Sequence, residues 1–172
     1  MPKQILLLRG INVGGHNKLP MKDLALILEG LGASDVQTYI QSGNVILSGA
    51  LREAAISDAI EAAKGFRPQV LLIDADKFQR IAKVNPYPET TTEGKTLHIW
   101  FLSAPAHFDD AKAAELATET EHFHVTERAI YLHAPDGIGR SKLAAKLESL
   151  AGVPATARNW NTIAKLLEML DA

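Results

Sequence analysis

Short apolar runs alternate with helical stripes along this chain of 172 residues. Residues 5–8 and 70–73 are continuous apolar runs with the length and β-branched or leucine content of buried strands. Leu24, Leu28 and Leu31 recur at the spacing of one helical face. The whole pattern predicts strands at 5–8, 36–40, 44–47, 70–73, 97–102, 122–126, 129–133 and 154–157. It predicts helices at 21–31, 51–64, 75–82, 109–118, 141–151 and 160–170.

The order of these elements occurs twice, although the two halves share no sequence similarity. A stretch rich in Pro, Thr and Gly at 85–94 separates them, so we expect subdomains at 1–84 and 95–172 joined by that linker. A split β-α-β unit with a central hairpin is the ferredoxin-like arrangement. The expected fold is therefore α+β, with two ferredoxin-like (βαββαβ) subdomains, each with an additional helix, packed into one compact body. Strands 5–8 and 70–73 are apolar on both faces. The face of their sheet that lies away from the helices must therefore be covered, by the second half or by a partner chain.

Composition narrows the class of protein. A hydrophobic share of 47% supports a true core, and a net charge of -2 gives no general attraction to nucleic acid. The chain has no cysteine, which excludes disulfides, thiolate catalysis and Cys-type zinc sites. No signal peptide and no apolar run near ~18 residues is present, so we expect a soluble cytoplasmic protein without a membrane partner.

The segment after the first strand, residues 9–18, combines glycines with hydrogen-bond donors. Glycines let the backbone wrap an anion with its N–H groups, and neighbouring cations add charge. The candidate ligand-binding residues here are Arg9, Asn12, Gly14, Gly15, His16 and Lys18. The alternative is that these glycines only form turns.

Three further polar segments are candidates for the same site. Ser141 follows a Gly-Ile-Gly turn as a helix N-cap, and helix N-termini attract anions, although the spacing differs from that of a P-loop. The candidates in these segments are Gln41, Ser42, Asn44, Arg140, Ser141, Lys142, Arg158, Asn159 and Asn161. Each is also explained as a turn residue, a cap or a solvated cation. If the segments converge, they form one anion-binding surface. In the last helix, Trp160 is expected to anchor the core.

Four sequence segments carry a family resemblance over nearly the whole chain. They are 7–15 (LLRGINVGG), 39–45 (YIQSGNV), 137–143 (GIGRSKL) and 156–162 (TARNWNT). Together they resemble the bacterial family called domain of unknown function 1697. The resemblance implies a pair of ferredoxin-like subdomains and no particular activity.

The favoured function is therefore binding of a small anionic, phosphate-containing ligand. Single-stranded nucleic-acid binding is an alternative, if His98 and Trp100 join Tyr131 and the histidines of the 122–133 hairpin on one open sheet face. The imidazoles of that hairpin also raise the idea of zinc, although no open coordination position or second shell is evident. An enzyme acting on a phosphorylated substrate remains a third possibility, with no catalytic residue, cofactor or oligomeric state indicated.

Overall fold

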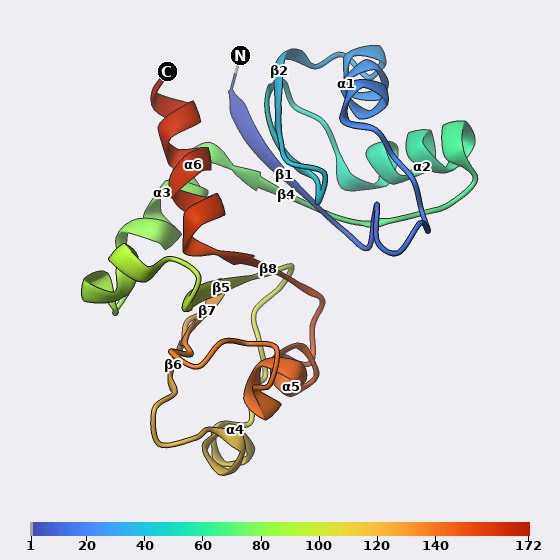
Figure 1. Ribbon diagram of the computed structural model, residues 1–172. Helices are drawn as coiled ribbons and strands as arrows, with labels where there is room; N and C mark the ends of the chain where they lie inside the picture. Colours follow the sequence, from blue (N-terminus) through green and yellow to red (C-terminus); the bar gives the residue numbers. More distant parts are fainter. Residues whose placement is uncertain (1) are drawn as a thin grey trace. The chain divides into compact units, whose positions relative to one another are not determined.

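The computed structural model describes residues 2–172, and this part of the chain forms two four-stranded antiparallel sheets (Figure 1). The first sheet, ordered β2-β3-β1-β4, contains β1 (Lys3–Arg9), β2 (Ser34–Tyr39), β3 (Asn44–Ser48) and β4 (Gln69–Asp74). The second, ordered β6-β7-β5-β8, contains β5 (Leu97–Leu102), β6 (His122–Val125), β7 (Ala129–His133) and β8 (Ala155–Asn159). This order is that of the split β-α-β unit, so the predicted α+β fold with two similar subdomains is confirmed.

The helices are α1 (Met21–Gly30), α2 (Glu53–Lys64), α3 (Ala75–Lys83), α4 (Asp110–Leu116), α5 (Lys142–Ala151) and α6 (Trp160–Asp171), with a 3-10 helix η1 (Pro88–Glu93). One face of each sheet packs against a pair of helices, α1 and α2 in the first unit and α4 and α5 in the second. In the first sheet Leu6 and Leu8 pack with the buried leucines and isoleucines of α1 and α2. In the second, Trp100 and Ile130 pack with α5 through Leu143. Each core thus lies between a sheet and its helix pair.

Most element ends differ slightly from the predicted ranges, and the differences at Ile40 and Trp160 affect side-chain positions. The predicted strand 36–40 ends at Tyr39, and Ile40 lies in the following loop with a left-handed backbone, at φ 51°. In α6, Trp160 is only half-buried, while Ile163 and Leu166 are fully buried. Trp160 occupies the first position of the helix, where its backbone N–H donates to the carbonyl of Gly94. Ile163 and Leu166, rather than Trp160, are therefore the core residues in this part of the helix.

The chain divides into two compact units. The first contains the residues up to Arg80 together with Leu166–Ala172, and the second contains Ile81–Lys165. The segment expected as a linker, 85–94, falls in the second unit and forms η1, which contacts β5. The Tyr131 hydroxyl donates to the Ile81 carbonyl at 2.7 Å, which fixes the start of this unit. The Pro, Thr and Gly content of 85–94 is typical of turns, and here the segment forms a short 3-10 helix.

The two sheets repeat the same register. Gln4 lies opposite Leu47 and Asp74, and His98 lies opposite Leu132 and Asn159. Gln4 and His98 therefore occupy equivalent places. The side-chain amide of Gln4 serves the backbone of Leu51, donating to its carbonyl at 3.5 Å and accepting from its N–H at 3.0 Å. The imidazole of His98 is 8% exposed, and its Nδ1 has no partner within residues 2–172.

The buried His98 should make the stability of the protein depend on pH. Burial lowers the pKa of His98 to about 4, whereas the unfolded chain takes up this proton near pH ~6.5. Between these values the unfolded state binds the extra proton, so stability is present above pH ~6.5 and falls as the pH drops towards 4. We expect this group to account for about 2–3 kcal/mol of that loss, from ~1.4 kcal/mol per pH unit.

Urea unfolding at pH 7, 5.5 and 4.5 measures this loss. His98→Gln, which places the residue of the equivalent strand position here, should flatten the pH dependence. The control His124→Gln changes an exposed imidazole and should leave the dependence as it is. An unchanged slope in His98→Gln would contradict the assignment.

Candidate functional site

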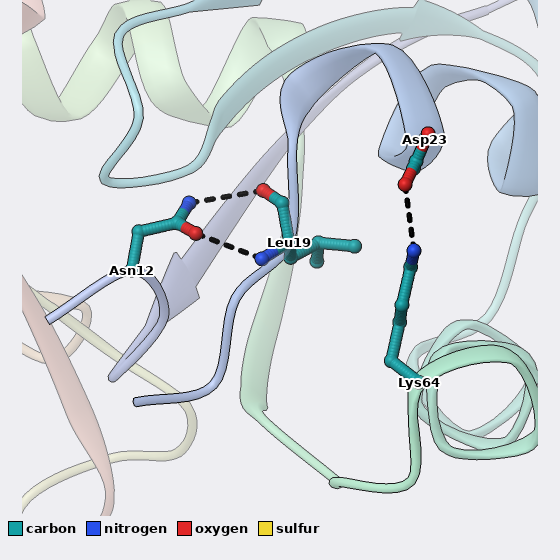
Figure 2. A network of polar contacts seen from close by, with 4 residues as sticks. All are labelled: Asn12, Leu19, Asp23 and Lys64. Carbon is teal, nitrogen blue, oxygen red and sulfur yellow. Dashed lines mark hydrogen bonds and ion pairs between the residues drawn. The ribbon is translucent and has the colours of Figure 1, made fainter. Parts of the chain in front are cut away.

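The loop after β1 is held in shape by Asn12. Its side-chain Nδ2 donates to the Gln41 carbonyl at 2.8 Å. Nδ2 also donates to the Leu19 carbonyl at 2.9 Å, and Oδ1 accepts from the Leu19 N–H at 2.7 Å (Figure 2). The same view shows the ion pair from Lys64 to Asp23, which joins α2 to α1. Asn12 has a left-handed backbone at φ 54°, as have Gly10, Gly14 and Gly15. The side chain of this predicted ligand residue is thus occupied in organising the loop itself.

The hairpin tip between β2 and β3 packs onto the same loop. The Leu8 N–H donates to the Gly43 carbonyl at 2.9 Å, and a Cβ on Gly43 would lie 2.8 Å from Cβ of Leu8. Asn44 is buried and donates to the carbonyl of Tyr39 and to Oγ of Ser42, which is the turn chemistry considered from sequence. Two of the four predicted polar segments therefore come together in the first unit.

The surface that these two segments share carries exposed cations and loop N–H groups. Its exposed candidate residues are Arg9, Gly14, Gly15, His16, Lys18, Gln41 and Ser42. The N–H groups of Gly14 and Gly15 have no acceptor within residues 2–172. Neither 9–20 nor 37–48 contains an Asp or Glu. We call this surface, formed by 9–18 and 40–43, the glycine-loop surface.

In the second unit, the turn before α5 behaves as a helix cap. Oγ of Ser141 accepts from the Ala144 N–H at 3.0 Å, which confirms its predicted N-cap role. Gly137 has a left-handed backbone at φ 90°. Arg140 and Lys142 are exposed and form no ion pair within the described part of the chain. The α5 N-terminus thus presents two cations beside its unpaired N–H groups.

The segment around β8 and the start of α6 is mostly occupied by its own structure. Oδ1 of Asn159 accepts from the Thr162 N–H at 3.0 Å, so Asn159 is the cap. Burial lowers the pKa of Arg158 to about 10, and the guanidinium donates to the Ala157 carbonyl. Arg158 therefore remains charged at neutral pH.

A turn at 94–96 anchors both polar segments of the second unit. Ala134, which precedes the capped turn, donates its N–H to the carbonyl of Thr96, and Trp160 donates to that of Gly94. A Cβ on Gly94 would collide with the side-chain amide of Asn161 and lie 3.0 Å from its backbone N, so a larger residue here would force Asn161 to shift. Composition alone gave no reason to single out Gly94, since it stands in a stretch that reads as a linker.

The predicted aromatic platform is wrong. In the ladder His122 lies opposite His133 and His124 opposite Tyr131. However, Trp100 lies opposite Ile130 and His98 opposite Leu132, which places both on the helix-covered face. Residues paired across an antiparallel ladder share a face, so neither can extend the surface of Tyr131.

Tyr131 itself is fully buried, and burial raises the pKa of its hydroxyl to about 12. Within residues 2–172 no three His, Asp or Glu side chains gather as metal ligands would. The idea of a histidine zinc site therefore finds no cluster to support it.

The chain matches the family described as "Protein of unknown function (DUF1697)" over residues 1–131. The chain belongs to this family. The matched range contains the glycine-loop surface, whereas the segments at 137–142 and 156–162 lie beyond it. A similar solved structure is that of the conserved bacterial protein SP0830 from Streptococcus pneumoniae, which is 24% identical with a TM-score of 0.65 and 98% of each chain covered. This likeness supports the fold.

Two further findings complete the comparison. No curated protein matches the sequence. In the described part of the chain, every helix is too short or too polar to span a membrane.

Proposed function

We propose that the glycine-loop surface binds a small ligand carrying a phosphate group. The observation that supports this most is the pairing of unoccupied N–H groups at Gly14 and Gly15 with exposed cations, in two segments that contain no carboxylate. Successive N–H groups in left-handed turns form a concave anion site, Lys18 adds positive charge, and His16 adds a ring hydrogen-bonding group. The Asn12 contacts hold this loop in place before any ligand arrives, which reduces the entropy cost of binding.

Affinity requires several of these donors to act together. Attraction of an anion to an exposed helix terminus is worth ~0.3–1 kcal/mol, and micromolar binding needs about 8 kcal/mol. For this reason we place Arg9, His16 and Lys18 around the loop N–H groups in one site. The α5 N-terminus, with Arg140 and Lys142, is a second anion-binding candidate, to be tested separately.

Binding is tested by calorimetry and thermal unfolding with inorganic phosphate, pyrophosphate and AMP, with sulfate for comparison. The double variant His16→Ala/Lys18→Ala should lose most of the ligand-induced rise in Tm while keeping the Tm of the free protein. The matched control Lys77→Ala/Lys83→Ala removes two exposed lysines of α3 and should bind like the parent.

The variant Arg140→Ala/Lys142→Ala separates the two candidate regions. If it alone abolishes the phosphate effect, the ligand binds at the α5 N-terminus and the glycine-loop proposal is wrong. Equal stabilisation of every variant by phosphate would mean that neither region binds it and that these residues only form turns and helix caps. Turnover of AMP or pyrophosphate in the same samples would identify an enzyme acting on phosphorylated substrates.

A further inference from the structure

Three of the four sheet edges in the described chain carry a feature that blocks strand addition. On β4, the outward N–H of Leu72 donates to the carboxylate of Glu53 at 2.9 Å. On β8, the N–H of Ala155 donates in the same way to Glu148 at 2.9 Å. On β2, the pairing is irregular between Ser34 and Gln37. Proteins protect edges in such ways because free edges pair with other chains.

The fourth edge, β6, is open. The Thr126 N–H donates to the Ala129 carbonyl, which sets the ladder so that His124 exchanges hydrogen bonds with Tyr131. The intervening residues Phe123 and Val125 therefore direct their N–H and C=O groups away from β7. No partner for these groups exists within residues 2–172. The strand has regular pairing and contains no Pro or Lys.

A groove of about 550 Å³ runs beside this open edge. Its apolar lining includes Phe108 and Phe123, whose ring centroids are 6.0 Å apart. Its charged lining consists of the carboxylates Asp110 and Glu127, and the lining contains no Lys or Arg. An open strand edge, an aromatic wall and acidic groups are the parts of a site for an extended basic peptide.

We propose that β6 binds a partner protein by strand addition, through an extended segment that carries an apolar residue and Lys or Arg on the same face. The backbone of the segment pairs with Phe123 and Val125, as in other β-augmentation sites. Phe108 and Glu127 line the same groove, and side chains two residues apart share a face of a strand. An apolar residue can therefore meet Phe108 while a basic residue two positions away approaches Glu127. A second copy of this chain fits less well, since its own edge carries the same two carboxylates. This inference does not depend on the proposed phosphate site.

The test uses the full chain, labelled with ¹⁵N, and two capped heptapeptides as probes. One is Thr-Lys-Thr-Val-Thr-Arg-Thr, in which Lys, Val and Arg share a face, and the other has Glu in place of Lys and Arg. Titration followed by NMR should shift the amide signals of Phe123 and Val125 with the basic peptide and leave them unchanged with the acidic one.

Two variants probe the two parts of the site. Val125→Pro removes an outward N–H that makes no ladder bond, so the sheet should persist while binding weakens about tenfold, with Val125→Thr as the control that keeps the N–H. Glu127→Lys reverses one wall charge and should weaken binding about fivefold, while Glu119→Lys, at another exposed position, should not. The charge reversal keeps the test valid if the proline variant fails to fold.

Several results would overturn the proposal. Amide shifts confined to other elements, or none with the basic peptide at millimolar concentration, would exclude strand addition at β6. Equal binding of both peptides would remove the role of Asp110 and Glu127. A concentration-dependent dimer in sedimentation experiments that Val125→Pro dissociates would identify a second copy as the occupant instead.

Discussion

Deletion of residues 166–172 should destabilise the first unit by at least about 4 kcal/mol. Leu166 is fully buried and Leu170 is 8% exposed, and these residues belong to the same compact unit as β1. Nζ of Lys3 also donates to the Leu170 carbonyl at 3.2 Å. Loss of one buried leucine costs ~2–5 kcal/mol, and a whole domain is stable by only ~5–15 kcal/mol. Urea unfolding and amide exchange in β1 and β3 measure the effect.

A shorter deletion provides the control. Removing only Asp171 and Ala172, which are both exposed, should change the free energy of unfolding very little. If both deletions behave like the parent, the last helix turns contribute nothing to the first unit and the assignment fails.

A fragment ending at residue 84 should associate rather than stay a dispersed monomer. It lacks 166–172, and it exposes the sheet face opposite α1 and α2, where Ile5, Leu7 and Ile46 are buried in the whole chain. A cooperatively unfolding monomer of 1–84 in sedimentation and urea experiments would contradict this expectation.

Gly43→Ala should cost about 2–5 kcal/mol. The left-handed backbone at φ 93° is unfavourable for alanine by ~1–2 kcal/mol, and a Cβ there would lie 2.8 Å from Cβ of Leu8 and 3.0 Å from Cδ1 of Ile11. Overpacking of this kind adds ~1–3 kcal/mol, because Leu8 and Ile11 are fixed in the core. Chemical denaturation of the purified variant gives the value directly.

Gly10→Ala separates the two contributions. Gly10 also has a left-handed backbone, at φ 76°, but a Cβ would meet nothing within 4 Å. This variant should therefore lose only the ~1–2 kcal/mol of stability that the left-handed backbone costs alanine. Equal losses for the two alanine variants would show that the hairpin tip does not press on the loop after β1.

Most of the fold could be predicted because it depends on local periodicity. Apolar runs and leucine stripes give the elements, and glycine and serine at helix ends give their limits, as at Ser141. The face on which a strand residue lies depends on register with strands far away in sequence, and a shift of one residue reverses it. This is why the sequence left open the face of His98 and Trp100, and why the hypothesis that they join Tyr131 is wrong.

The glycine-loop surface was predictable in part. Glycines and donors at 9–18 indicated a flexible polar loop, and the structure shows the hairpin tip beside it. The use of Asn12 as an internal clamp could not be anticipated, because an amide next to glycines serves a ligand and a backbone equally well. The left-handed Ile40 had no signal at all, since isoleucine disfavours that conformation.

The division of the chain also affects the order in which the two units fold during synthesis on the ribosome. The first unit begins at β1 yet needs Leu166 and Leu170, so it cannot be completed until the chain beyond Lys165 has been made. At translation rates of ~5–20 residues per second, the apolar strands β1, β3 and β4 wait for several seconds with their final contacts missing. During that time the second unit, which is continuous from Ile81 to Lys165, has all its residues available first. The half of the protein that is translated later is thus expected to finish folding earlier.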